Sequence, residues 1–153
     1  MRLYEIYLVH QRVANDYFGK DDKLFQLFVE AKTARDAHLI QILNKQIQYV
    51  TRYISATAIY QCVERNVRMA QNKSMHQTWK NLRIIDGKGF VNLRCFSGQL
   101  IIEATGSLNQ EAWVFEALRT LDDCFLAVDC QNGTSGWLKP PKIVSLVKAK
   151  VEA

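Results

Sequence analysis

The apolar positions along the chain follow two different periods, and their order predicts strands and helices in turn. Residues 3–9 place apolar side chains at every second position, the period of a strand with one buried face. A short helix is expected next, and Gly19 would end it because glycine enters the left-handed cap conformation without steric cost. The run over residues 23–44 is helical, and residues 33–36 are a candidate break that would divide it into two helices.

The pattern beyond this run predicts an alternation of helices and short strands. Residues 47–51 alternate in polarity, which favours a short strand or an extended link. Trp137 stands between a glycine-containing loop and a Pro-Pro pair, where a large aromatic side chain can seal a sheet edge. The remaining predictions are two helices, three strands joined by turns and one short apolar strand, over residues 58–70, 110–121, 82–85, 90–96, 100–104 and 124–128. Together they predict a single α/β domain in two layers, with a mostly antiparallel or mixed sheet and helices packed on one face.

Length and composition agree with one folded domain. The chain has 153 residues, of which 48% are hydrophobic and 23% are charged, and these values are typical of globular proteins. Its longest apolar runs are too short to span a membrane. The chain starts directly in strand-like sequence, without a hydrophobic signal core, so a cytoplasmic location is expected.

The net charge of +5 is concentrated in two parts of the chain, the segment from Arg65 to Arg94 and the C-terminal tail. A basic stripe attracts phosphate or an acidic protein surface, although a solvated face that only aids solubility has the same composition. Nucleic-acid binding would also need aromatic side chains that stack on bases. Phe90 and Phe96 alternate suitably on one predicted strand, but the simpler interpretation places both in the core.

Sequence motifs for catalysis, cofactor binding and metal binding are absent. The chain has no phosphate-binding loop, no Gly-x-Ser-x-Gly, no His-Glu-x-x-His and no paired metal-ligand spacing. Its four cysteines lack Cys-x-x-Cys spacing and are expected to be small buried side chains. The pair Asp122-Asp123 is expected in a solvated loop, and Asp129 at a turn. We therefore expect neither an enzyme nor a cofactor or metal site.

Several short motifs occur in an order that resembles the sporulation inhibitor of replication (SirA) family of spore-forming bacteria. After the first strand comes Ala-Asn-x-Tyr-Phe-Gly, at residues 14–19, followed by Leu-Phe-x-Leu-Phe at residues 24–28. Lys-Gln-Ile-Gln-Tyr follows at residues 45–49. The C-terminal third adds Cys-Phe-Leu-Ala-x-Asp at residues 124–129 and Gly-Trp-Leu-x-Pro at residues 136–140. The resemblance implies one domain over residues 1–142 and a separate basic tail over residues 143–153.

The resemblance also implies a function and a set of contact residues. Proteins of this family bind the N-terminal domain of the replication initiator DnaA, so the chain is expected to be a negative regulator of replication initiation during sporulation. It would block assembly of the initiator at the origin, without catalysis and without a cofactor. Asn15 is expected to add a hydrogen bond at the rim of the contact. The residues expected to contact DnaA are Val13, Asp16, Tyr17, Gln46 and Tyr49.

Overall fold

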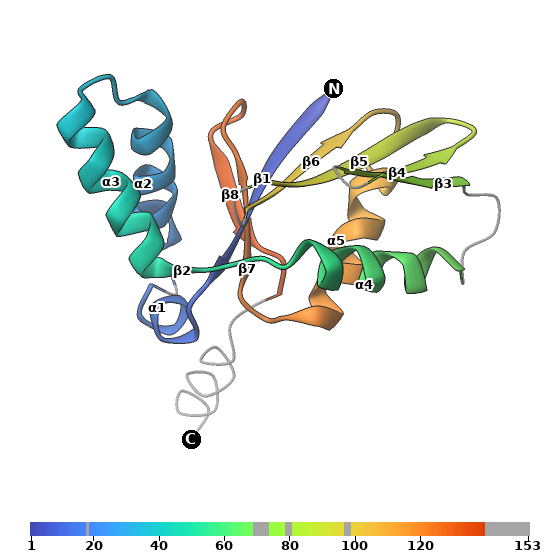
Figure 1. The fold of residues 1–153 in the computed structure, drawn as a ribbon, viewed down its shortest axis with the longest axis horizontal. Helices are drawn as coiled ribbons and strands as arrows, with labels where there is room; N and C mark the ends of the chain where they lie inside the picture. Colours follow the sequence, from blue (N-terminus) through green and yellow to red (C-terminus); the bar gives the residue numbers. More distant parts are fainter. Residues whose placement is uncertain (18, 69–73, 79–80, 97–98, 140–153) are drawn as a thin grey trace.

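The computed structural model describes residues 1–17, 19–68, 74–78, 81–96 and 99–139 (Figure 1). The predicted tail, residues 143–153, lies outside the described residues. In chain order the helices are α1 (Gln11–Asp16), α2 (Asp21–Thr33), α3 (Ala37–Val50), α4 (Ala56–Arg68) and α5 (Asn109–Leu121). The strands are β1 (Arg2–Val9), β2 (Thr51–Arg52), β3 (Ser74–Gln77), β4 (Asn81–Asp86), β5 (Gly89–Phe96), β6 (Gln99–Ala104), β7 (Phe125–Asp129) and β8 (Thr134–Trp137).

The strands form one sheet in the order β3-β4-β5-β6-β1-β7-β8, with the short strand β2 paired to β1 outside this path. All strand pairs within the described residues are antiparallel. One of the predicted turns joins β4 to β5 in a hairpin, where Asp86 and Gly89 pair across the sequence Asp-Gly-Lys-Gly. A single α/β domain with an antiparallel sheet is therefore confirmed.

The helices form two groups that lie on opposite faces of the sheet (Figure 1). Side chains alternate between the faces along each strand, and the two faces bury two separate hydrophobic clusters. The α4–α5 cluster includes Ile6, Val63, Leu82, Leu93, Ile102 and Leu118. The α1–α2 cluster includes Tyr7, Val9, Ala14, Leu24, Phe28 and Leu126. The prediction placed helices on one face only. Helices α1 to α3 form an additional layer on the other face, over β1, β7 and β8.

The predicted break in the first long helical run is confirmed between α2 and α3. Ala34 ends α2 in an extended conformation, and Asp36 caps α3 by accepting a hydrogen bond from the His38 amide at 3.3 Å. The prediction of an extended segment over residues 47–51 was wrong, because α3 continues to Val50. Leu43, Ile47 and Val50 recur at helical spacing and turn toward the core, so the 3.6-residue period prevails over the short alternation.

Two further elements differ from the predictions. Strand β3 was not predicted; it is short and largely exposed, and it lies at the outer edge of the sheet. The apolar spacing along residues 110–121 predicts Ala112, Val114, Leu118 and Leu121 on the buried stripe of α5; Val114 and Leu118 are buried, together with Ala117, but Ala112 and Leu121 are exposed. The short apolar strand predicted over residues 124–128 corresponds to β7, which is buried on both faces because helices cover both of its sides.

Two contacts fasten α2 to the sheet. The Tyr7 and Phe28 rings stack with centroids 3.8 Å apart and planes 6° apart. Lys32 of α2 forms an ion pair with the buried carboxylate of Glu5 on β1, and the same carboxylate accepts a hydrogen bond from the Tyr7 hydroxyl at 2.8 Å. These contacts fix the position of α2, and through it that of α3, against β1.

We expect Trp137→Ala to lower the free energy of unfolding by about 3 kcal/mol or less, the low end of the range for buried aromatic truncations. Trp137 lies on the edge strand β8, opposite Leu126, and packs against the α1–α2 cluster while remaining partly exposed. Its edge position agrees with the sequence-based expectation. Chemical denaturation measures the change, and an unchanged midpoint would show that the ring does not seal the edge.

Candidate partner-binding groove

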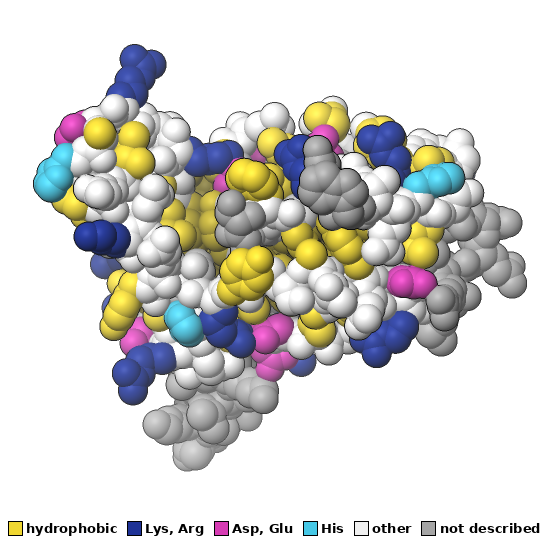
Figure 2. Space-filling view, in the orientation of Figure 1, with side chains coloured by type: hydrophobic (Ala, Val, Ile, Leu, Met, Phe, Trp, Pro, Cys, Tyr) yellow, Lys and Arg dark blue, Asp and Glu magenta, His cyan; other side chains and the backbone are white. Residues whose placement is uncertain are grey.

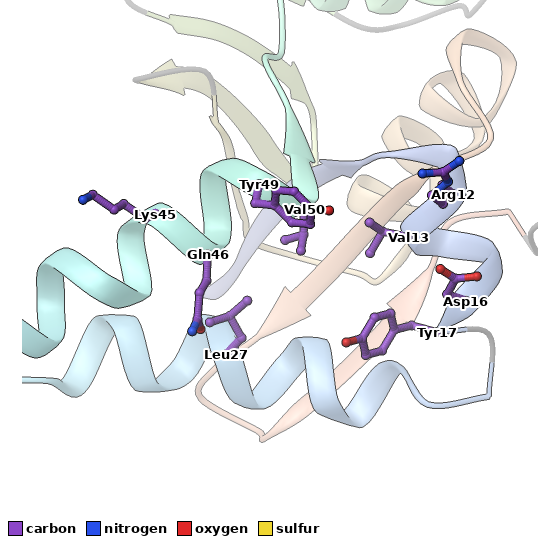
Figure 3. Close-up of a pocket in the computed structure, with 9 residues that line it drawn as sticks. All are labelled: Arg12, Val13, Asp16, Tyr17, Leu27, Lys45, Gln46, Tyr49 and Val50. Atoms are coloured by element: carbon purple, nitrogen blue, oxygen red, sulfur yellow. The ribbon is translucent and has the colours of Figure 1, made fainter.

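A surface groove of about 530 Å³ lies where α1, α2 and α3 meet (Figure 3). Its walls come from three segments that are separate in the sequence, and α2 contributes Leu27. The residues that line it are Arg12, Val13, Asp16, Tyr17, Leu27, Lys45, Gln46, Tyr49 and Val50. All five residues that the sequence nominated for partner contact therefore line one groove.

Helix α1 enters the groove because both of its ends are fixed. At its start, the His10 amide donates to the Val50 carbonyl at 3.0 Å, which joins α1 to the end of α3. Within the helix, the Ala14 side chain is fully buried on the face that packs against the core. After its end, Gly19 has φ = +80°, as the sequence predicted, and the chain reverses into α2. Anchored in this way, a six-residue helix can hold Val13 and the C-cap residue Tyr17, which are about one turn apart, on the same wall.

Helix α3 supplies the opposite wall. Thr51 and Arg52 pair with the end of β1 and hold the last turn of α3 beside the start of α1. Gln46 and Tyr49 are three residues apart on this helix, so they lie on neighbouring positions of one face. Figure 3 shows Gln46 directed toward Leu27 of α2. The sequence placed Tyr49 just after a helix, and the structure places it in the last turn of α3.

The groove combines an apolar centre with a polar rim. Val13, Leu27 and Val50 are half-buried and supply aliphatic surface. Tyr49 projects from the rim with 80% of its surface exposed. The charged side chains are Asp16 on one wall and the cations Arg12 and Lys45, which lie at opposite ends of the group in Figure 3. An apolar centre bordered by polar groups is typical of a protein-binding surface.

The groove has four lining residues that the sequence did not nominate. Arg12, Leu27, Lys45 and Val50 line the groove but were not nominated. Continuing α3 to Val50 would have revealed Lys45 and Val50, because residues 45 and 49 and residues 46 and 50 are each one helical turn apart. Asn15, expected at the rim, does not line the groove, and its side chain accepts a hydrogen bond from Gln11 at 3.0 Å.

Acidic residues outside the groove have structural partners. Asp122 was expected in a solvated loop, but its Oδ1 accepts hydrogen bonds from Arg52 at 3.0 Å and from the Cys124 amide at 2.9 Å. Asp123 forms an ion pair with Lys139. Asp129 organises a turn as expected, since Oδ1 accepts from the amides of residues 131 and 132. Within the described residues, no group of three His, Cys, Asp or Glu side chains is arranged to hold a metal ion.

The cysteines are unpaired thiols in apolar surroundings. Cys62 and Cys124 are buried and contribute to the two hydrophobic clusters. Burial raises the pKa of Cys95 to about 11 and also raises the pKa values of Cys124 and Cys130. A raised pKa leaves these thiols protonated at neutral pH and therefore poor nucleophiles.

We therefore expect a variant with all four cysteines changed to alanine to keep its partner affinity, although it loses stability where Cys62 and Cys124 are buried. The measurement is partner binding under conditions where circular dichroism shows the variant to be folded. Loss of binding by a folded variant would indicate a functional thiol.

The basic segment from Arg65 to Arg94 does not form one surface within the described residues. Arg65 is exposed on α4, which covers one face of the sheet. Arg83 and Arg94 lie on the opposite face, because Leu82, Ile84 and Leu93 between them point into the α4–α5 cluster. Figure 2 also shows Lys and Arg side chains dispersed over the visible surface. Arg68, Lys73 and Lys80 were part of the predicted stripe; nothing is described of the Arg68 side chain, and the two lysines lie outside the described residues.

The helices within the described part of the chain are too short or too polar to cross a membrane.

Comparison with known proteins extends over nearly the whole chain. The family model described as "Sporulation inhibitor of replication protein SirA" matches residues 2–142. The chain is also similar to the sporulation inhibitor of replication protein SirA of Bacillus subtilis (strain 168), with 30% identity over 142 residues that cover 92% of this chain and 95% of the relative. The matched region includes the three helices of the groove and the full sheet. The chain therefore belongs to the SirA family.

Proposed function

We propose that the protein is a negative regulator of DNA replication initiation during sporulation, and that it acts by binding the N-terminal domain of the initiator DnaA in the groove. Binding would occupy a surface that the initiator needs for assembly at the origin, so inhibition comes from competition and requires no catalysis. The name of the Bacillus subtilis relative supports the role in sporulation and replication. A protein that acts on the initiator at the origin works in the cytoplasm.

One observation supports the groove as the contact site above all others. The five residues nominated from family motifs come from two segments about thirty positions apart in the sequence, and they converge on one groove. Tyrosine is enriched among residues that dominate binding energy, since it offers a large rigid surface with a polar tip. Tyr17 and Tyr49 stand on opposite walls, so one inserted side chain of the partner could contact both.

The charges at the rim suggest how the partner is oriented. Arg12 and Lys45 flank an apolar centre that carries Asp16 as its acidic group. A segment of DnaA with an apolar side chain next to a carboxylate would fit this groove. The apolar side chain would pack in the centre, and the carboxylate would form an ion pair with one of the two cations. Rim charges mainly affect association rate and orientation, so the apolar centre is expected to supply most of the affinity.

The proposal is tested by pulling down the purified N-terminal domain of the cognate DnaA with the full-length chain. Retention of the domain by the wild-type chain is expected. The DnaA protein without this domain serves as the control and should not be retained. Retention of the control, or no retention of the isolated domain, would contradict the proposed contact.

A further inference from the structure

The half of the sheet formed by β3 to β6 has a face that no helix covers within the described part of the chain. Helices α4 and α5 pack on the other face of these strands, while α1 to α3 pack over β1, β7 and β8. Alternation along β5 sends Val91 and Leu93 into the α4–α5 cluster and places Phe90, Arg94 and Phe96 on the uncovered face. We call this surface the open face.

The open face carries two aromatic side chains, and the sequence-based view of both as core residues was wrong for one of them. Phe96 is 65% exposed at the end of β5. Phe90 is half-buried at the other end of the strand, where the Arg83 guanidinium lies 4.5 Å from its ring centroid. Six residues of extended strand separate the two rings by about 20 Å. Phe96 is therefore accessible to a base, in contrast to the core position that the sequence suggested.

The charges of the open face are mainly positive. Arg83 and Arg94 are exposed, and Lys88 is exposed on the adjoining turn. His76 lies beside Arg83 on the edge strand β3. On β6 the acidic residue is Glu103, whose carboxylate is 3.9 Å from Arg94. Figure 2 shows hydrophobic and cationic side chains next to one another along the margin of the molecule over these strands.

The centre of this face holds a polar group without a partner. Asn92 lies between Phe90 and Arg94 on the same side of β5 and is only 5% exposed. Its side-chain oxygen has no hydrogen-bond partner among the described residues. A buried polar atom usually has such a partner. The face therefore combines stacking surfaces and cations, and the Asn92 amide lies buried beneath them.

We infer that the open face binds single-stranded nucleic acid. Proteins that bind single strands combine a cationic surface, which follows the backbone, with aromatic side chains on which successive bases stack. Phe96 provides one such ring, and the guanidinium of Arg83, supported from below by Phe90, provides a second planar surface. The open face presents no helix or β-ribbon that could enter the major groove of DNA. It therefore suits unpaired bases better than a duplex.

The inference is independent of the proposed contact with DnaA. None of Arg83, Phe90, Arg94 and Phe96 lines the groove between α1 and α3. The two sites lie on the same side of the sheet, over different strands, so one molecule could engage a protein and a single strand together. The two proposals are tested by different variants, so loss of support for one site would not decide the other.

The test is fluorescence anisotropy with a labelled oligothymidine of about 16 nucleotides, titrated with the full-length chain at low and moderate salt. We expect saturable binding that weakens as salt rises, and that is at least several-fold weaker for a duplex of equal length. Phe96→Ala should weaken binding to the single strand roughly tenfold, the loss of about one stacked base. Arg83→Ala with Arg94→Ala should weaken binding further and reduce the salt dependence.

Matched controls make the outcome decisive. Tyr53→Ala removes another exposed aromatic that lies off the open face, and it should leave oligothymidine affinity unchanged. Phe96 is exposed, so its loss should not unfold the protein, and thermal melts verify this. Dissociation constants weaker than about 10⁻⁴ M at low salt, or equal affinity of wild type and the Phe96 and arginine variants, would overturn the inference. So would variants that lose DnaA binding but keep oligothymidine binding, since the face would then contact protein.

Discussion

Phe28→Ala is expected to lower the free energy of unfolding by about 3–5 kcal/mol, which is a large part of the stability of a single domain. Phe28 has no exposed surface and stacks on Tyr7, so truncation leaves a cavity between α2 and β1. The ion pair between Lys32 and Glu5 lies one turn further along α2, so these side chains do not occupy the cavity. Urea denaturation followed by circular dichroism measures the loss.

Phe28→Leu is the matched control for this prediction. Leucine keeps most of the apolar volume but loses the ring stacking, so its cost should be clearly smaller than that of alanine. Because α2 forms the floor of the groove, the alanine variant should also bind the partner more weakly in proportion to its unfolded fraction. Equal stability of wild type and Phe28→Ala would mean that α2 is not held to the sheet by this contact.

Val13→Asp is expected to weaken binding of the DnaA N-terminal domain by at least ~2 kcal/mol, about thirtyfold in affinity. Val13 is part of the apolar centre of the groove, and Asp16 lies one turn further on the same helix. The new carboxylate would be desolvated by the partner without a cation placed to pair with it in the centre of the groove. It would also sit beside a like charge.

Val13→Thr separates charge from polarity in this test, because threonine has nearly the shape of valine and carries no charge. We expect Val13→Thr to keep much more affinity than Val13→Asp in calorimetric titrations, at equal folded fraction. Similar affinities for both variants and wild type would place Val13 outside the contact.

The elements with one clear hydrophobic period were predictable from the sequence. The alternation of β1, the left-handed glycine that follows α1 and the break between α2 and α3 all depend on local residue preferences. The end of α3 was not predictable in the same way, because residues 47–51 fit both periods. Packing of Ile47 and Val50 against the α1–α2 cluster, which only the tertiary structure supplies, decides for the helix.

The candidate site was predictable as a set of residues but not as a shape. The motifs indicated Val13, Tyr17 and Tyr49, but α3 comes to lie beside α1 through tertiary contacts, the pairing of β2 with β1 and the hydrogen bond from His10 to Val50. The aromatic side chains of the open face were assigned to the core for a related reason. Alternation along a strand does not tell which of the two faces is buried. Phe96 is exposed because the helices cover the other face of β5, which carries Val91 and Leu93.

The two groove tyrosines differ in burial, so their alanine variants should behave differently. Tyr17 is half-buried and packs against the α1–α2 cluster, so Tyr17→Ala should lower both affinity and melting temperature. Tyr49 projects from the rim and is the cleaner probe, because removing an exposed ring should scarcely change stability.

The most direct test of the groove as the DnaA-binding site compares Tyr49→Ala with Tyr53→Ala in calorimetric titrations of the DnaA N-terminal domain. Both tyrosines are 80% exposed and lie four positions apart, but only Tyr49 lines the groove. We predict that Tyr49→Ala loses about thirtyfold in affinity while Tyr53→Ala binds like the wild type, with unchanged melting temperatures for both. Equal affinities for the two variants, or a greater loss for Tyr53→Ala, would contradict the assignment of the groove.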